Sequence, residues 1–338
     1  MARGFLPGLA TGLLATPLPL AMALTTRALC GLHQLVGLAP PPPPADESAN
    51  LADVHVLYSS SADYFPALLV SMISLVQHLS APSRCSIHLL VPAEDLARAT
   101  DLAECLRLEV AVGDRALPKL LVHAVRPLPF STGKFRPFNG RRNQSEMLYA
   151  RLFAGDYMPD VGRVLYLDTD VIVKADIGPL YRMRMDHTVA ARPTTWITYL
   201  QCWALPIMQD FPEEFMFNSG VLLIDLDRWR AESVASAIAE LLNATEGCIA
   251  EQLAMNAHFR GAFDRLPGHW HKESLGEVPW KRWVAPACSS GILHWTGPNK
   301  FWLSPRYRDV DFLVRPHLPR RHCAALQQDL QELYSLDA

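Results

Sequence analysis

The feature that most constrains the fold is an apolar run from Arg163 to Val173 that contains two carboxylates one residue apart. The residues on either side of Asp168 and Asp170 are rich in Val, Ile and Leu, which is typical of a strand buried in a parallel sheet. In extended backbone, residues two apart point to the same side, so we expect both carboxylates to face one spot. Ligands of open α/β sheets bind beyond the carboxyl ends of the strands, so the run predicts a site here.

Two carboxylates held side by side indicate a bound cation. Neighbouring anions repel each other and lose hydration unless a positive charge lies between them. A hard divalent cation meets this need because it prefers oxygen ligands. The alternative is that one Asp caps a turn at the strand end while the other is merely solvated. The pair alone leaves this choice open, because so short a pattern also occurs by chance.

Strands and helices are predicted to alternate from residue 52 onward, which indicates an α/β fold with a mostly parallel sheet and right-handed crossovers. We expect strands at residues 54–58, 86–91, 120–125 and 221–224, and helices at residues 64–79, 93–106, 145–153, 232–242 and 251–258. In such a sheet a mononucleotide binds at the end of the first strand, between Tyr58 and Tyr64. No Gly-rich phosphate loop follows that strand, which disfavours a P-loop or a dinucleotide fingerprint.

The composition of the 338-residue chain is that of a globular protein. Half of the residues are hydrophobic and the formal net charge is -3, so neither a disordered chain nor a nucleic-acid-binding protein is predicted. The seven cysteines form no C-x-x-C pair and no metal-ligand spacing. The cysteines therefore predict no metal site of their own.

The first residues differ from the rest of the chain. Residues 5–24 carry no charge and are long enough to span a bilayer, although Pro7, Pro17 and Pro19 argue against a regular helix. We favour an uncleaved signal-anchor within residues 1–39, with a cleaved signal peptide or a transit peptide as alternatives. The domains that follow are a proline-rich stem at residues 40–50, a folded domain at 51–315 and a C-terminal surface helix at 316–338.

This organisation predicts a type II protein of the Golgi or another secretory-pathway membrane, with its folded domain in the lumen. The N-terminal segment would hold the protein to the membrane. Glycosylation sequons at Asn143 and Asn243 agree with a luminal domain. Secretion and delivery to a plastid are the alternatives.

A series of motifs follows along the chain in a set order. They are Leu148-Tyr149-Ala150-Arg151-Leu152, Val164 to Asp170, Phe217-Asn218-Ser219-Gly220-Val221 with Trp229, Glu251-Gln252 with Asn256, and His294-X-X-Gly297-X-X-Lys300-X-Trp302. Together they resemble the family 8 glycosyltransferases, which are retaining enzymes that use sugar nucleotides. The resemblance covers residues 54–302 and implies a GT-A-type, Rossmann-like single catalytic domain.

The resemblance also implies a Mn²⁺ site in which Asp168 and Asp170 are joined by His294. The diphosphate of a sugar nucleotide leaves poorly until its charge is neutralised, which a divalent metal achieves as a Lewis acid. Lys300 would pair with the diphosphate as a point charge. Gly297 would let the backbone approach the diphosphate closely.

Other positions are implied to contact the sugar nucleotide or the transferred sugar. Arg151 would lie near the sugar nucleotide, and Tyr64 would stack on uracil at the end of the first strand. Asn218 and Gln252 would lie on the sugar face as catalytic residues. Glu251, a further catalytic candidate, stands beside Gln252 where the family usually has Asp.

The expected reaction is transfer of a hexosyl-type sugar from a UDP-sugar to a glycan or other hydroxyl acceptor. Because Gln252 is an amide and a poor nucleophile, we expect retention by same-face attack rather than by double displacement. The chain departs from the family pattern at Phe301, which replaces Pro, and at Trp270-His271, which replaces Trp-Asn. The alternative is a pseudoenzyme that binds a sugar nucleotide, in which Phe301 and Glu251 have ended turnover.

Overall fold

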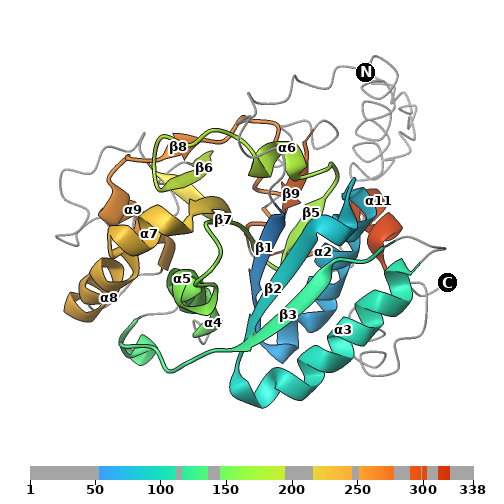
Figure 1. Ribbon diagram of the computed structural model, residues 1–338, viewed down its shortest axis with the longest axis horizontal. Helices are drawn as coiled ribbons and strands as arrows, with labels where there is room; N and C mark the ends of the chain where they lie inside the picture. Colours follow the sequence, from blue (N-terminus) through green and yellow to red (C-terminus); the bar gives the residue numbers. More distant parts are fainter. Residues whose placement is uncertain are drawn as a thin grey trace, which may run out of the picture.

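A sheet of seven strands forms the centre of the domain, in the order β3-β2-β1-β4-β7-β6-β8 (Figure 1). Its strands are β1 (Val54–Ser59), β2 (Cys85–Val91), β3 (Lys119–Ala124), β4 (Arg163–Leu167), β6 (Val189–Pro193), β7 (Phe217–Asp225) and β8 (Asp264–Arg265). β1 pairs in parallel with β2 and β4, as β2 does with β3 and β6 with β8. β7 runs antiparallel to both of its neighbours. The sheet is therefore mixed but mostly parallel, as predicted.

The computed structural model describes residues 53–111, 116–135, 145–194, 216–245, 251–277, 290–297, 299–302 and 311–319. The predicted signal-anchor and stem lie outside these ranges, as does most of the predicted C-terminal helix. The first residues of that predicted helix form a short 3₁₀ turn, Arg315–His317. Within the described ranges, no helix is both long and apolar enough to cross a membrane.

The central strands are buried because elements cover both faces of the apolar runs that form them, whereas the edge strand β3 has no buried residue. Every residue of β2 is buried, and in β7 all but the last residue are buried. β7 begins at Phe217, four residues before the predicted start, because Phe217 and Asn218 pair with β6. The sequence did not predict β6, which contains Arg192 and Pro193 and lacks a clear strand pattern.

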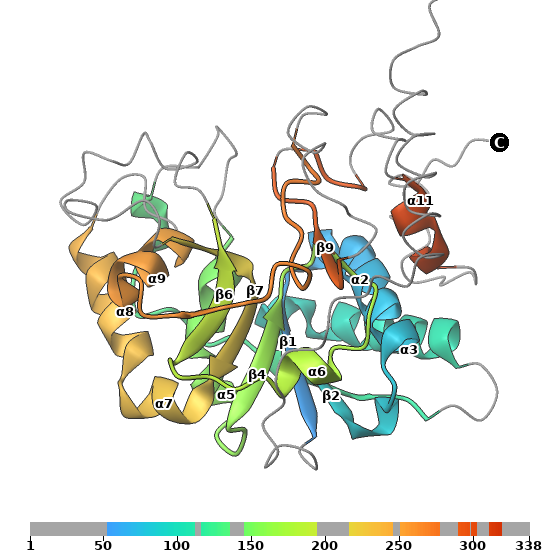
Figure 2. The same ribbon diagram turned by 90° about the horizontal axis from the view of Figure 1, so that it is seen from above.

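Helices cover both faces of the sheet (Figures 1 and 2). One face carries α2 (Phe65–His78) and α3 (Leu96–Val110), and the other carries α4 (Met147–Ala150), α5 (Ala154–Tyr157), α7 (Leu226–Ala231), α8 (Val234–Ala244) and α9 (Glu251–Phe259). The predicted helix at residues 145–153 is divided into α4 and a 3₁₀ turn, Arg151–Phe153, and α5 follows directly after it. The helix predicted at 232–242 starts only at Val234, because Ser233 is left-handed with φ 52° and separates it from α7.

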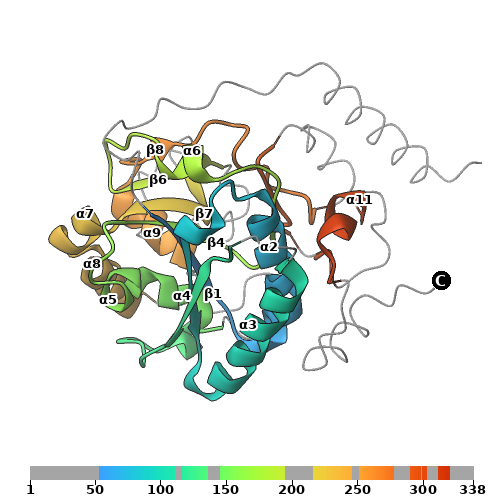
Figure 3. The ribbon, with the colours of Figure 1, turned by 45° about the vertical axis from the view of Figure 1, so that its right-hand side comes forward.

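A second, two-stranded sheet lies beside α2. It pairs β5 (Val171–Val173) antiparallel with β9 (Ile292–His294), and Val171 lies opposite His294. The core of this region joins Ile172 and Leu293 to Val70 of α2 and to Leu313 of α11 (Asp311–Val314), which Figure 3 shows next to α2. The short helix α6 (Gly178–Tyr181) follows β5. This small sheet places His294 beside the end of β4.

Candidate metal and sugar-nucleotide site

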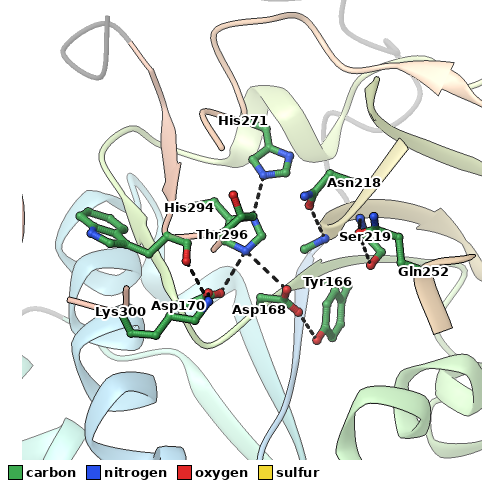
Figure 4. Close-up of polar contacts among 12 residues, drawn as sticks. Tyr166, Asp168, Asp170, Asn218, Ser219, Gln252, His271, His294, Thr296 and Lys300 are labelled. Atoms are coloured by element: carbon green, nitrogen blue, oxygen red, sulfur yellow. Dashed lines mark hydrogen bonds and ion pairs between the residues drawn. The ribbon is translucent and has the colours of Figure 1, made fainter. Parts of the chain in front are cut away.

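The candidate site lies where β4 ends and β7 begins, beside β9 (Figure 4). β4 and β7 are antiparallel, and Leu167 lies opposite Val221, so the residues that follow β4 lie next to Gly220. The backbone N–H of Asp168 donates to the carbonyl of Gly220 at 2.8 Å. Since β1 and β4 are parallel, the site lies at the carboxyl end of both strands, as predicted for an open α/β sheet.

Asp168 and Asp170 converge, but not because both lie in a strand. β4 ends at Leu167, and a turn at Thr169 and Asp170 precedes β5. The backbone N–H of Trp295, directly after β9, donates to the carbonyl of Asp170 at 3.0 Å and holds this turn against the small sheet. The predicted convergence is confirmed, whereas the extended backbone predicted for the pair is wrong because the chain bends between the two sheets.

Asp168, Asp170 and His294 form one cluster of candidate metal ligands. Nε2 of His294 lies 3.0 Å from Oδ1 of Asp170 and 3.5 Å from Oδ2 of Asp168. One ligand atom of each residue lies within 4.8 Å of the other two. Two carboxylate oxygens and one imidazole nitrogen form a donor set that fits a divalent metal ion. The fold therefore brings together the three residues that were predicted to hold a metal.

Each aspartate uses its other oxygen for a contact that orients the carboxylate. Oδ1 of Asp168 accepts hydrogen bonds from the Tyr166 hydroxyl at 2.7 Å and from Arg151 at 3.0 Å. Oδ2 of Asp170 accepts from the ammonium group of Lys300. Each carboxylate therefore keeps one oxygen next to His294, as a shared metal ion requires.

Burial and charge act against each other in this cluster. Burial alone would raise the pKa of Asp170, but Lys300 and His294 outweigh it and lower that pKa. Burial alone would lower the pKa of His294, but Asp170 and Asp168 outweigh it and raise the pKa to about 9. In the absence of a metal, the carboxylates are therefore ionised and His294 is protonated at neutral pH. His294 and Lys300 then supply the positive charge that a metal ion would otherwise supply.

Arg151 lies behind Asp168 and is not a surface charge. Its side chain is only 2% exposed and forms ion pairs with Asp168 and Glu251. It also donates to the carbonyl of Ser219 at 2.9 Å, and its guanidinium lies 4.4 Å from the centre of the Tyr166 ring. Arg151 was predicted to lie near the sugar nucleotide. Among its observed contacts, the one that reaches the site is with Asp168, whose carboxylate faces the cluster.

The three predicted catalytic residues lie around the start of β7: Asn218, Glu251 and Gln252. Oε1 of Gln252 accepts from the backbone N–H of Ser219 at 2.9 Å, and lies 3.0 Å from its hydroxyl. The buried Glu251 accepts from Arg151 and, at 3.2 Å, from the same hydroxyl. Oδ1 of Asn218 accepts from the N–H of Gly220 at 2.8 Å. Gln252 is only partly buried, so it is the most accessible of the three.

Tyr64, Gly297 and Lys300 border the cluster. Tyr64 follows β1, is 42% exposed and makes an edge contact with Trp302, with 6.1 Å between ring centres. Lys300 also donates to the carbonyl of Trp295 at 2.8 Å. Gly297 has φ 106°, and a Cβ at this position would lie 2.8 Å from the backbone of Gly276. The close contact with the backbone of Gly276 by itself requires glycine at position 297. An approach of this backbone to a diphosphate would be a second reason for glycine.

Three residues without a predicted role complete the site. Tyr166 and Ser219 lie inside motifs that the sequence singled out, but the partners of their side chains depend on the fold. His271 is fully buried, and its Nε2 lies 2.9 Å from Nδ1 of His294. Its only sequence signal is that it replaces the Asn expected after Trp270.

Comparison with known proteins places this geometry in a family. The model of glycosyl transferase family 8 matches residues 55–305. The chain is 24% identical over 289 residues to probable galacturonosyltransferase-like 4 of Arabidopsis thaliana, with 78% of each protein covered. It is 26% identical over 292 residues to probable galacturonosyltransferase-like 7 of the same plant, which covers 79% of this chain and 76% of the relative.

Solved structures of glycosyltransferases share the fold. The bifunctional glycosyltransferase WbbM superposes with a TM-score of 0.64 at 16% identity, covering 85% of this chain and 53% of WbbM. The galactosyltransferase LgtC, solved in complex with donor and acceptor sugar analogs, superposes with a TM-score of 0.54 at 20% identity. That match covers 84% of this chain and 96% of LgtC.

The mostly parallel α/β sheet has the GT-A fold of these glycosyltransferases, and its acidic pair and histidine lie at the carboxyl end of the sheet. The chain belongs to glycosyl transferase family 8, whose model matches most of its length. The resemblance that the ordered motifs indicated is thereby confirmed.

Proposed function

We propose that this chain transfers a hexosyl-type sugar from a UDP-sugar to a hydroxyl group of a glycan or another acceptor, with Mn²⁺ as cofactor and with retention. The observation that carries the proposal is the cluster of Asp168, Asp170 and His294, whose ligand atoms lie within 4.8 Å of one another. Nucleotides bind α/β sheets at this end of the strands. Membership of family 8 supports a sugar nucleotide as the donor.

The names of the relatives support a six-carbon pyranose as the transferred sugar. The curated relatives are described as probable galacturonosyltransferase-like proteins and LgtC as a galactosyltransferase. Tyr64 supports a UDP donor, because an exposed aromatic ring beside Trp302 offers a face on which uracil can stack. A panel of UDP-sugars decides among glucose, galactose, galacturonate and N-acetylglucosamine.

The residues in and around the cluster would have separate roles in binding the metal and the donor. Asp168 and Asp170 would each bind the metal through one oxygen, and His294 through Nε2. When bound, the metal would neutralise negative charge on the leaving diphosphate. Lys300 lies against Asp170 on a flexible stem and would turn to the diphosphate as a second positive charge. Arg151 would keep Asp168 oriented throughout.

Retention without a covalent intermediate is favoured by the groups at the start of α9. Double displacement needs a carboxylate nucleophile next to the anomeric carbon. Glu251 is a carboxylate, but it is buried and paired with Arg151, so we assign it to the support of Arg151. Gln252 is partly exposed and would contact the transferred sugar. The acceptor would attack from the face of the departing phosphate, which would take the acceptor proton.

A panel of UDP-sugars, scored for hydrolysis and transfer with and without Mn²⁺, tests the proposal. We expect one sugar to be turned over, and turnover to be lost with a chelator. Asp168→Asn and Asp170→Asn each remove one charge while keeping the shape, and we expect most turnover to be lost in both. Full turnover in either variant would exclude the metal role. Binding of UDP and Mn²⁺ with no hydrolysis or transfer would favour the pseudoenzyme.

The stereochemical part of the proposal has its own test. We expect NMR of the product to show the anomeric configuration of the donor, both for the wild-type protein and for Gln252→Ala. That variant should transfer more slowly without being inactive, because it loses one contact with the sugar. An inverted product, or a covalent sugar adduct on Glu251 or Gln252, would refute same-face attack.

A further inference from the structure

His271 contacts the candidate metal ligand His294 on the side opposite the carboxylates (Figure 4). Nε2 of His271 lies 2.9 Å from Nδ1 of His294, while Nε2 of His294 is the atom next to Asp170. The two rings are stacked, with 5.1 Å between their centres and 25° between their planes. His271 is completely buried. The two imidazoles therefore form a pair of which only one reaches the carboxylates.

The backbone around His271 fixes its position relative to His294. The N–H of Lys272 donates to the carbonyl of Ile292 at 2.8 Å, and the N–H of His294 donates to the carbonyl of Lys272 at 2.7 Å. These bonds align the segment after His271 with β9, which carries His294. In addition, Arg192 donates to the carbonyl of His271. These three hydrogen bonds hold the backbone of His271 and Lys272 beside β9, so the side chain of His271 starts from a fixed position next to His294.

The chemistry of a bound imidazole explains why this contact matters. A neutral imidazole carries one proton, and a ring that binds a metal through Nε2 must carry that proton on Nδ1. In His294, Nδ1 is buried and needs a hydrogen-bond acceptor. Nε2 of His271 lies within hydrogen-bond distance and can accept this proton. Partners of this kind commonly fix the tautomer and the orientation of a metal-binding histidine.

His271 has no competing use for its side chain among the described residues. Its other nitrogen, Nδ1, is buried and has no hydrogen-bond partner there. A buried imidazole with a single polar contact is an unfavourable choice for packing alone, because an apolar side chain would leave no polar atom unsatisfied. The one contact that it does make is with His294.

We propose that His271 is a positioning residue, which accepts the Nδ1 proton of His294 and so holds Nε2 of His294 toward Asp168 and Asp170 for metal binding. This inference rests on the proposed metal site and adds a residue to it. Because His271 would orient the metal ligand His294, its effect should appear as a change in metal affinity, measured without donor or acceptor.

Two substitutions separate hydrogen bonding from packing. His271→Leu removes the acceptor, whereas in His271→Gln the amide oxygen can reach the position of Nε2 and accept the same proton. Binding of Mn²⁺ to each purified protein is measured from the EPR signal of free Mn²⁺. We expect His271→Leu to bind Mn²⁺ about 10–100-fold more weakly than the wild type, the range typical of such partners. His271→Gln should recover most of this loss.

The outcomes distinguish this inference from the proposed function. Equal Mn²⁺ affinity in His271→Leu and the wild type, or equal losses in the Leu and Gln variants, overturns the inference alone, provided that Asp168→Asn binds Mn²⁺ poorly. A wild-type protein that binds no Mn²⁺ overturns both. A second measurement needs no folded variant of His271. In wild-type protein labelled with ¹⁵N-histidine and loaded with Cd²⁺, Nδ1 of His294 should carry the proton, and a proton on Nε2 of His271 overturns the inference.

Discussion

Nη1 of Arg151 lies 3.0 Å from Oδ1 of Asp168, the oxygen that the carboxylate does not share with His294. A buried cation thus holds one side of a candidate metal ligand while the other side remains available. The same guanidinium pairs with the buried Glu251. Glu251 therefore offsets the charge of Arg151, and Arg151 orients Asp168. The orientation of the acidic pair therefore depends on Arg151, which need not contact the metal or the donor itself.

Replacing Arg151 with Met tests this support. The variant leaves Glu251 buried without its partner, and removal of one member of a buried ion pair typically costs about 3–5 kcal/mol of unfolding free energy. We expect a loss of this size in urea unfolding. The double variant Arg151→Met with Glu251→Leu removes both charges and should recover a large part of the loss. A single variant as stable as the wild type would show that the pair does not support the fold.

Gly220 is predicted to be essential for the metal cluster on steric grounds. A Cβ at Gly220 would lie 2.1 Å from Cε1 of His294 and 2.7 Å from Oδ2 of Asp168. Gly220→Ala must therefore displace a ligand, and we expect Mn²⁺ affinity measured by EPR to fall by at least tenfold. Gly268→Ala is the matched control, because a Cβ there meets nothing within 4 Å. Unchanged Mn²⁺ binding in Gly220→Ala would contradict the cluster geometry.

Lys300 is expected to compete with the metal for Asp170 until a donor binds. Its ammonium group forms an ion pair with the same carboxylate, so Lys300→Met should bind Mn²⁺ several-fold more tightly in the absence of nucleotide. The same variant should bind UDP more weakly in the presence of Mn²⁺, because a positive charge for the diphosphate is lost. Titrations with Mn²⁺ and with UDP measure the two effects. Lys119→Met, at an exposed position on β3, should change neither.

Stability is predicted to fall in mild acid because of a row of histidines across β1, β2 and β3. His88 lies between His55 and His123, with nitrogen–nitrogen distances of 3.0 and 3.2 Å. Burial, followed by the charges of these neighbours, lowers the pKa of His88 to about 4. Because this pKa lies below the unfolded value of 6.5, the unfolded chain binds more protons, and stability is lost as pH falls from 6.5 toward 4.

Unfolding free energies at pH 7 and pH 5 measure this effect. From His88 alone we expect stability to be about 2 kcal/mol lower at pH 5 than at pH 7. His317, whose pKa is also lowered to about 4, mainly by burial, adds to the same trend. The comparison is therefore between the wild type and His88→Gln, which should depend less steeply on pH. Equal pH dependence in both proteins would exclude this role for His88.

Local patterns in the sequence were enough to predict most of the sheet. β1, β2 and β3 lie within one residue of the predicted strands, and β4 ends directly before Asp168. These elements follow from short apolar runs, which can be recognised without knowing which strand lies beside them. The ordered motifs likewise identified Asp168, Asp170 and His294, because each motif is contiguous in the chain.

The direction and partners of the later strands required the tertiary structure. β7 runs antiparallel to β4, and β6 pairs with its first residues, but an apolar run is the same in either direction and in either register. β5 and β9 are only three residues long, so neither has a pattern of its own, and their pairing is a contact between distant parts of the chain. That pairing is what carries His294 to Asp170.

The sequence by itself determined the fold class, the acidic pair and the family, because each follows from short patterns of neighbouring residues along the chain. Only the tertiary structure decided how those residues are supported: the turn that brings Asp168 and Asp170 together, the buried pair of Arg151 and Glu251, and the contact between His271 and His294. The turn is held by a backbone hydrogen bond from the distant Trp295. The two side-chain pairs join residues far apart in sequence, whose charge and burial become defined only when the sheets are assembled.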